Sequence, residues 1–325
     1  MTRGRLAGPP VRRQRGAALL LAMIIVVLVV SATAGMVWQQ TRAVSIESAE
    51  RARAQAAWIL NGALDWARLI LREDRRGQRS STHDSLDEPW ATPLAEARLS
   101  TFLAADQDNN TEGGPEAFIS GGITDAQARY NLAGLVDDAG KVVPAQLAAF
   151  ERLCGVVGTA SDTAARIAEA MRAARAPAAD DGTRGAPLRP SRLADLAWQG
   201  IEAATLAQLE PYVDLLPVAT AVNANTAPRE VLMAAIDGID LGTAERLVQK
   251  RLGKPYKQLE DMRADLPATA VLEPTRVGVS SNYFEVAGRL RLEDRVLEER
   301  SLLVRRDNRV DVLRRERRSF TVAAR

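Results

Sequence analysis

An uncharged stretch of 25 residues, Ala17 to Thr41, constrains the fold of this chain more than any other feature. Its first 21 residues are nearly all Ala, Leu, Ile, Val or Met. In a helix, with a rise of about 1.5 Å per residue, about 20 such residues cross the hydrocarbon core of a bilayer, which is about 30 Å thick. The stretch therefore predicts a single transmembrane helix.

Close to this stretch, positive charge is concentrated on its N-terminal side. Five arginines precede it: Arg3, Arg5, Arg12, Arg13 and Arg15. Behind it, the first basic residue is Arg42 and the first acidic residue is Glu47. Because basic flanks stay in the cytoplasm, the N-terminus is predicted to be cytoplasmic and the chain after Arg42 to lie outside the cytoplasm.

A cleaved signal peptide and a plain membrane anchor are alternatives with the same basic start. The apolar core of a signal peptide is about 7 to 15 residues long and is followed by a small-x-small cleavage site. Here the apolar run is longer, and the small residues Ser31 to Gly35 lie inside a pattern that continues as helix. Gly16, at the boundary of the basic leader, offers a third possibility: cleavage after it would leave Ala17 as a new N-terminus with the helix intact.

The helical pattern continues beyond the apolar stretch. Apolar residues recur every three or four positions from Val44 to Ile70, with charged residues between them. This spacing predicts one helix from about Ala17 to Arg75. Its apolar stripe requires a globular domain to cover it.

The first strands of a sheet are predicted after this helix. A short helix is expected over Leu94 to Ala105, and strand-like runs cover Ala117 to Ile123 and Ala128 to Leu132. The polar residues around the short helix predict loops.

One of these loops resembles a calcium loop only in part. Asp106, Asp108 and Asn110 alternate as calcium ligands do. An EF-hand would need glycine at Thr111 and glutamate at Ala117, so a solvated loop is the better interpretation.

From Pro144 to Pro274 the pattern is helical. The predicted helices are Pro144 to Gly155, Thr159 to Ala174, Ser191 to Gln199, Ala204 to Leu209, Ala227 to Ile236, Gly242 to Arg251 and Leu259 to Ala264. Thr226 and Ser191 are expected to cap two of them.

Strand patterns return after the helical block. Strands are predicted over Tyr283 to Leu292, Val296 to Val304 and Arg309 to Leu313, with a hairpin turn at Asp307-Asn308. Strands on both sides of a helical block imply one sheet domain with an insertion, so the late strands should complete the sheet that begins near residue 117.

A segment inside the helical block resembles helix-hairpin-helix DNA-binding sequences. It reads NANTAPREVLMAAIDGIDLGTAERLVQKRLGKPYKQLEDM. However, Gly238 and Gly242 are four residues apart instead of two, and Asp240 places a negative charge where a phosphate would approach. A helical packing module is favoured over nucleic-acid binding. A weaker copy of the same pattern occurs at RPSRLADL, whose Asp195 corresponds to Asp261, and suggests two related helical units.

No enzymatic motif is present, and the chain is predicted not to be an enzyme. There is no nucleophile elbow, P-loop or paired metal spacing. The only cysteine, Cys154, cannot form an internal disulfide, and the only histidine, His83, cannot form a histidine-based zinc site.

The stretch RQRGAALLLAMII resembles a type IV prepilin leader, and the chain as a whole resembles the K-type minor pseudopilins of the type II secretion system (general secretion pathway protein K). Further matching stretches are ITDAQARYNLAGL, RPSRLADL, LEPYVDLLPVATAVNANTAPREVL and KPYKQLEDM. The resemblance implies cleavage by prepilin peptidase between Gly16 and Ala17 and N-methylation of Ala17. A generic minor type IV pilin and a membrane-anchored periplasmic DNA-binding or competence protein are the alternatives.

The resemblance implies an α+β, pilin-like fold in which a long N-terminal helix packs on a small antiparallel sheet. The expected domains are a leader (1–16), a transmembrane helix (17–41), the first part of the pilin-like domain (42–140), an inserted α-helical domain (141–275) and C-terminal strands (276–325).

Leu21 is the most telling residue of this resemblance. Most prepilins have glutamate there, and the K-type family lacks it. In the bilayer an unpaired carboxylate costs a few kcal/mol, which a subunit within a filament recovers by pairing with the N-terminal amine of the subunit above. A subunit at the tip has no neighbour above it, so Leu21 marks a tip position.

The resemblance also implies partners and a location. The partners are the I- and J-type minor pseudopilins, with the H-type and major pseudopilins as further candidates; nucleic acid is not expected. The chain would sit in the inner membrane with its globular part in the periplasm, and would initiate and cap a filament that exports folded proteins. The family often binds calcium near the start of the helical domain, where Asp180 and Asp181 are the weak candidates.

Overall fold

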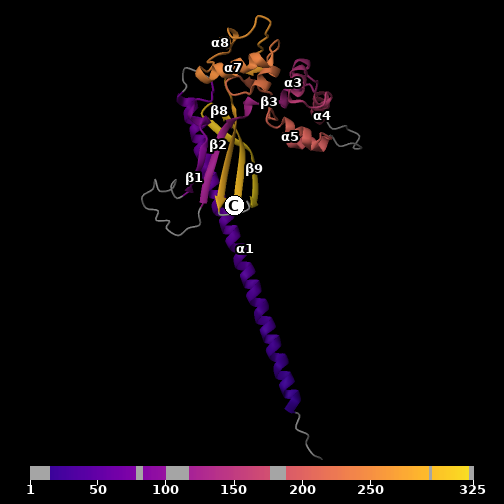
Figure 1. Ribbon diagram of the computed structural model, residues 1–325, viewed down its shortest axis with the longest axis vertical. Helices are drawn as coiled ribbons and strands as arrows, with labels where there is room; N and C mark the ends of the chain where they lie inside the picture. Colours follow the sequence, from indigo (N-terminus) through magenta and orange to yellow (C-terminus); the bar gives the residue numbers. More distant parts are fainter. Residues whose placement is uncertain (1–14, 78–82, 100–116, 176–187, 293–294, 322–325) are drawn as a thin grey trace, which may run out of the picture. The chain divides into compact units, whose positions relative to one another are not determined.

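The computed structural model describes residues 15–77, 83–99, 117–175, 188–292 and 295–321 (Figure 1). The chain divides into two compact units, residues 1–59 and 60–325. One helix, α1 (Arg15–Gly77), runs through both and confirms the predicted long helix.

The first unit consists, as far as it is described, of the N-terminal part of α1. The large apolar side chains of its membrane-spanning stretch are exposed, Leu21 at 61%. Hydroxyl groups here are satisfied within the helix: Thr33 Oγ1 lies 2.9 Å from Val30 O, and Thr41 Oγ1 lies 2.9 Å from Val37 O. This helix is long and apolar enough to cross a membrane, and its backbone groups need no outside partner in lipid because they bond within the helix.

The second unit is built on a five-stranded antiparallel sheet in the order β1-β2-β7-β8-β9. The strands are β1 (Leu94–Arg98), β2 (Ala117–Asp125), β7 (Tyr283–Leu292), β8 (Arg295–Arg306) and β9 (Arg309–Thr321). The late strands thus complete the sheet begun at β2, as predicted. The β8–β9 turn is at Asp307-Asn308, and Asp307 has a left-handed backbone (φ 49°).

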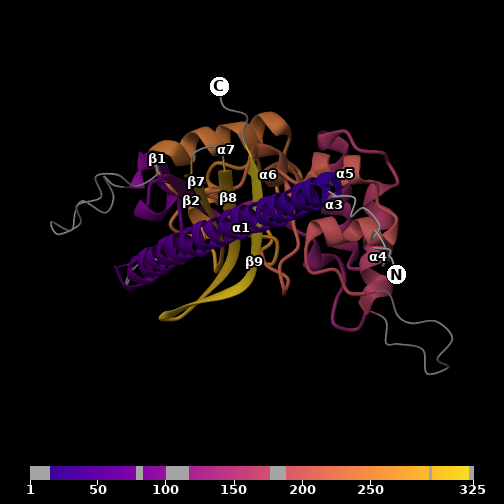
Figure 2. The same ribbon diagram turned by 90° about the horizontal axis from the view of Figure 1, so that it is seen from below.

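The last part of α1 covers one face of this sheet (Figures 1 and 2). Leu64, Ala67 and Leu71 of α1 are buried in one cluster with Phe284 and Trp90. The spacing of these α1 residues, three and four apart, puts them on one side of the helix. At Gly288 the helix approaches closely, because a Cβ there would lie 3.0 Å from Leu60 Cδ2.

The predicted helix from Leu94 to Ala105 is wrong over Leu94–Arg98, whereas Leu99 is helical. Leu94–Arg98 is the edge strand β1, which pairs antiparallel with β2 and has a register shift between Leu94 and Ala97. Pairing with an existing strand overrides the helical propensity of Leu, Ala, Glu and Arg. Residues 100–116, including Asp106, Asp108 and Asn110, lie outside the described part.

The predicted strand over Ala128 to Leu132 is also largely wrong. Only Tyr130–Asn131 forms a strand, β3, and it pairs in parallel with β4 (Val213–Asp214) instead of joining the sheet. The 3-10 helices η2 (Ala126–Ala128) and η3 (Leu132–Leu135) flank it.

Between β2 and β7 the chain is mainly helical. The elements are α3 (Pro144–Val157), α4 (Thr163–Arg175), the 3-10 helix η4 (Leu193–Gln199), α5 (Ala203–Leu209), α6 (Arg229–Ala235), α7 (Leu241–Gly253) and α8 (Leu259–Arg263). They share one core that includes Phe150, Leu196 and Leu232. Each predicted helix is present, with the Ser191 to Gln199 prediction realised as 3-10 helix.

This helical block contains two related repeats. The first runs from β3 to β4, and the second from β5 (Val222–Asn223) to β6 (Val277–Gly278), which also pair in parallel. In the first, Asp195 accepts hydrogen bonds from the backbone N–H groups three and four residues earlier, at 3.2 and 2.9 Å. Asp261 of the second does the same, at 3.3 and 3.2 Å. The internal similarity predicted from Asp195 and Asp261 is therefore confirmed.

Candidate functional site

The predicted processing and tip-marker residues lie at the start of α1. Gly16 and Ala17 fall within the first turn of the helix, and Leu21 follows one turn later. Ala17 and Leu21 are exposed. The prediction of cleavage and methylation is not tested by this geometry and stays a prediction.

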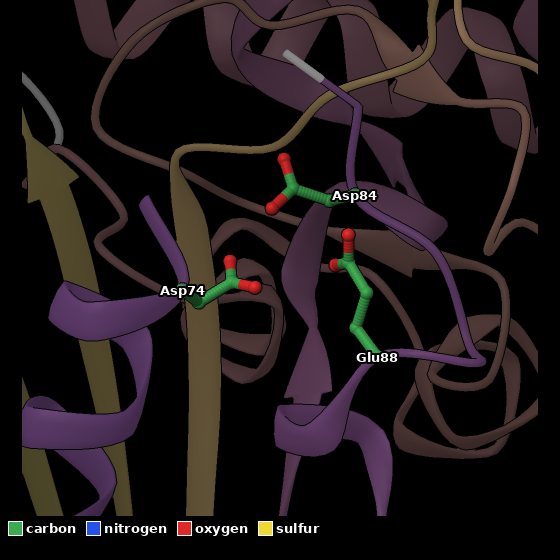
Figure 3. A group of neighbouring side chains, drawn as sticks. All are labelled: Asp74, Asp84 and Glu88. Atoms are coloured by element: carbon green, nitrogen blue, oxygen red, sulfur yellow. The ribbon is translucent and has the colours of Figure 1, made fainter. Parts of the chain in front are cut away.

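The weak calcium candidates Asp180 and Asp181 lie outside the described residues. Within the described part, one group of acidic side chains has the geometry of a metal site: Asp74, Asp84 and Glu88 (Figure 3). Each offers an oxygen within 4.8 Å of the other two. Asp74 comes from the last turn of α1, whereas Asp84 and Glu88 precede the 3-10 helix η1 (Pro89–Ala91).

A guanidinium group already lies among these carboxylates. Arg305 from β8 donates from Nη1 to Asp74 Oδ2 at 2.8 Å and from Nη2 to Asp84. The side chains of Arg305 and Asp84 are 1% and 0% exposed. Arg305 therefore pairs with two of the carboxylates, and the group is an ion-pair centre that ties α1, the loop after it and β8 together.

The electrostatics of this centre follow from its burial. Burial raises the pKa of Asp74, and the Arg305 charge opposes that rise. Burial also raises the pKa of Glu88 to about 7, although hydrogen bonds from Trp90 and Ser85 oppose the rise. Trp90 Nε1 donates to Glu88 Oε2 at 2.6 Å. The hydrogen bond donated by the indole thus lowers the free-energy cost of ionising the partly buried Glu88 without removing that cost.

A second buried carboxylate joins the sheet to the helical block. Asp125, at the end of β2, accepts hydrogen bonds from Asn223 Nδ2 at 2.9 Å, Thr226 Oγ1 at 2.6 Å, Ser281 Oγ at 2.6 Å and Gln127 N at 2.8 Å. Burial raises the pKa of Asp125, and these donors oppose the rise. All four donors are neutral, so this carboxylate differs from Asp84, whose partners include Arg305.

The capping predictions for Thr226 and Ser191 are wrong, and the carboxylates explain why. Helix α6 has Pro228 at its N-cap position, and the Thr226 hydroxyl donates to Asp125 instead. The N-cap of η4 is Arg192, and the Ser191 hydroxyl donates to Asp195 Oδ2 at 2.9 Å. In both places a nearby carboxylate accepts a hydrogen bond from the hydroxyl group.

Two more ion-pair contacts hold the helical block on the sheet. Arg129 Nη2 lies 2.5 Å from Asp214 Oδ2 of the first repeat and 3.3 Å from Glu285 Oε2 of β7. Arg192 Nη1 of η4 lies 3.4 Å from Glu316 Oε1 of β9. The block is thus attached to the sheet by several independent polar contacts.

In the segment that resembles a helix-hairpin-helix motif, the N-terminus of α7, which follows the turn, is already capped. The Asp240 carboxylate caps α7 by accepting from Thr243 N at 2.7 Å. Gly238, before it, has φ +78°, and a Cβ there would lie 2.5 Å from Thr269 O. The turn therefore serves packing, and Asp240 fills the place where a phosphate would bind.

The residues of the ion-pair centre and of the Asp125 network were not predicted from the sequence. Arg305 and Asp84 are 221 residues apart, and Asp125 and Ser281 are 156 apart. No local spacing signals such pairs.

Comparisons with known proteins match this architecture. Two family models, both described as type II secretion system (T2SS) protein K, match residues 128–218 and 222–280. These segments coincide with the first and second repeats of the helical block. A search of curated proteins finds no match.

Among solved structures, the chain is similar to one titled as the GspK-GspI-GspJ complex of the type 2 secretion system from enterotoxigenic Escherichia coli. The similarity has a TM-score of 0.63 at 19% sequence identity, and it covers 83% of this chain and 98% of that chain. At this identity the likeness shows the fold, which is the α+β pilin-like fold predicted from the sequence.

Proposed function

We propose that this chain, a minor pseudopilin that belongs to the type II secretion system protein K family, occupies the tip of the pseudopilus, where it initiates assembly and caps the filament. The role is structural and involves no catalysis by the chain itself. It would support the export of folded proteins from the periplasm across the outer membrane.

The observation that carries this proposal is Leu21. From Ala17 to Thr41, α1 contains no charged residue, and the position four residues after Ala17 is apolar. A carboxylate in the bilayer is costly unless it has a partner. A tip subunit has no subunit above it to supply an amine, so an apolar residue suits the first position of a filament.

The insertion supports the same role. The helical block is attached to the sheet through Asp125, Arg129 and Arg192. A block held on a pilin-like sheet by several contacts would hinder the stacking of another subunit there. Such a block suits a subunit that ends a filament.

Location and processing form part of the proposal. The single apolar helix and the family fit a single-pass membrane-anchored protein. We expect this to be the inner membrane, with a cytoplasmic N-terminus and residues after Arg42 in the periplasm. Prepilin peptidase would cut between Gly16 and Ala17, and intact mass of the membrane form would then show a chain that begins at a methylated Ala17. An intact Met1 would contradict this.

The proposed partners are I- and J-type pseudopilins, because the similar solved structure is titled as a complex of those three proteins. The H-type and major pseudopilins are further candidates. Co-expression followed by purification in detergent should yield a complex that contains this chain with the I- and J-type proteins. Recovery of this chain alone would contradict the tip role.

The tip position is tested by Leu21→Glu. The introduced carboxylate would have no partner above it and would cost a few kcal/mol in the bilayer. Assembly and secretion should therefore be unchanged or reduced. Leu20→Glu, one position away, is the matched control for the cost of a charge. A clear gain in secretion with Leu21→Glu alone would contradict a tip position.

A further inference from the structure

The last strand of the sheet, β9, has one edge that no other strand covers. It is the terminal strand in the order β1-β2-β7-β8-β9 and pairs with β8 on its other side. Near its start the edge is closed, because Arg68 Nε donates to Val310 O at 2.9 Å. Along Leu313–Thr321, among the residues that the structure describes, no group outside β8 bonds to the backbone. Every second residue of this part therefore turns free N–H and C=O groups away from the sheet.

The side chains of this open edge are mostly basic. Residues 314–318 read RRERR, which is four arginines and one glutamate. Leu313 and Phe320, which flank them, are 40% and 43% exposed. The open edge thus presents a basic centre between two exposed apolar residues.

Two of these arginines share a single carboxylate. Arg315 Nε lies 3.3 Å from Glu299 Oε1 of β8, and Arg317 Nε lies 2.5 Å from Glu299 Oε2. The Glu299 side chain is only 4% exposed, so it is held on the sheet and is the sole acidic partner of both guanidinium groups in the described part of the chain. One positive charge of this pair is therefore not balanced.

The other two arginines have still less acidic neighbourhood. Arg314 Nε lies 3.3 Å from Glu316 Oε1, but the same oxygen lies 3.4 Å from Arg192 Nη1. Arg318 forms no ion pair with a carboxylate of the described residues. Because β9 is extended, Arg314 and Arg318 point to the same face of the sheet. These two guanidinium groups have donors left for an incoming carboxylate.

The chemistry of the edge selects one kind of occupant. A second copy of this chain is disfavoured, because pairing RRERR with itself would place arginine beside arginine. A helix cannot use the free backbone groups, since its own are bonded within the helix. An extended segment that carries carboxylates satisfies both the edge backbone and the arginines.

We propose that Leu313–Thr321 is a docking edge for an acidic, extended segment of another protein, which adds to the five-stranded sheet beside β9. The main chain of that segment pairs with the free edge, and its carboxylates accept hydrogen bonds from Arg314 and Arg318. Main-chain pairing supplies the affinity, and the arginines select acidic segments over others. Such docking goes beyond the proposed tip role and does not depend on it.

The test uses the full mature chain in detergent and a fluorescently labelled nine-residue peptide in which glutamate and threonine alternate. Threonine favours strands, and the alternation puts all the glutamates on one face. We expect binding by fluorescence anisotropy in about 0.15 M salt, together with slower amide hydrogen exchange along Leu313–Thr321. The same peptide with a central proline should bind about tenfold more weakly or worse, because proline lacks the N–H group that a ladder needs.

A charge reversal on the edge tests the role of the arginines. Arg318→Glu should weaken binding of the acidic peptide about tenfold or more. The matched control is Arg309→Glu, which changes the net charge equally at an exposed arginine of the same strand, beside Val310 where the edge is closed. It should leave binding within about twofold. If Arg318→Glu fails to fold, Arg318→Gln decides, with an expected loss of about threefold.

Several results would overturn the docking edge. These are no binding of the acidic peptide by the wild type, equal binding of the proline peptide, and equal losses for the variants at Arg318 and Arg309. Tighter binding of duplex DNA than of the peptide, lost in Arg318→Glu, would assign the basic edge to nucleic acid and also overturn it. The tip role is tested separately, by co-purification with the I- and J-type proteins.

Discussion

The two units of this chain satisfy their polar groups in opposite ways. In residues 15–59, the hydroxyl groups of Thr33, Thr41 and Ser45 lie within hydrogen-bond distance of carbonyl groups three or four residues earlier in the same helix. In residues 60–321, Arg305 and Asp84 pair across 221 residues. The first arrangement suits lipid, where no other partner is needed, and the second holds a complicated fold in one conformation.

The largest effect should come from breaking the long-range arrangement at Arg305. Arg305→Met leaves the Asp84 carboxylate buried without its cation, which should lower the free energy of unfolding by about 3 to 5 kcal/mol. Chemical unfolding of the full chain in detergent measures this. The matched control is Arg306→Met, because Arg306 is the exposed neighbour on β8. Equal losses of unfolding free energy for the two variants would show that the ion-pair centre contributes no more to stability than an exposed arginine does.

A somewhat smaller effect is expected at Asp125, whose partners are all neutral. Asp125→Ala leaves the Asn223, Thr226 and Ser281 side chains without their acceptor, which should cost about 3 kcal/mol. Asp125→Asn keeps one oxygen acceptor and should cost less. The same unfolding measurement compares the two. A larger loss for the asparagine variant would contradict the role of Asp125 as an acceptor of neutral donors.

Glu88 should make stability depend on pH. Its folded pKa is about 7, against an ordinary value of 4.5. The folded state therefore holds the proton more tightly, so the stabilisation is complete below about pH 4.5 and is lost as pH rises toward 7. The loss should be about 1 kcal/mol, since Glu88 is only partly buried and solvent screens it.

Glu88→Gln is the variant that checks this pH dependence. The amide oxygen still accepts from Trp90 Nε1, but the side chain does not ionise. The free energy of unfolding, measured between pH 5 and pH 8, should then vary less with pH than in the wild type. An unchanged slope would assign the pH dependence to another group.

Structure that depends on local contacts is predicted from the sequence better than structure that depends on contacts between distant segments. Helix α1 was predicted to within two residues because its signal is local and repeats along its whole length. Strand β7 was predicted with both ends correct, because its alternating pattern is bounded by polar residues on each side. The repeats were predicted from the matching local spacing around Asp195 and Asp261, and each of these residues bonds to backbone N–H groups only three and four residues away.

The errors have the opposite cause. Leu94–Arg98 has the composition of a helix, and only pairing with β2 makes it a strand. Thr226 is a residue type that often caps helices, but its hydroxyl donates to the distant Asp125 instead. Tyr130–Asn131 pairs with β4, which lies more than 80 residues later. In each case a contact between distant segments decides the local structure, and the sequence pattern carries no sign of it.

The smallest effect is expected in the first unit, where one substitution tests whether the hydroxyl groups depend only on partners within their own helix. Thr33→Val removes a hydroxyl whose acceptors, Val29 O and Val30 O, lie one turn back in the same helix. These carbonyls keep their backbone partners, so the free energy of unfolding of the full chain in detergent should change by less than about 0.5 kcal/mol. Binding to the I- and J-type partners should also be unchanged. Weaker partner binding by Thr33→Val, with stability unaltered, would mean that this hydroxyl bonds between helices in the assembled complex, and the first unit would then also depend on long-range polar contacts.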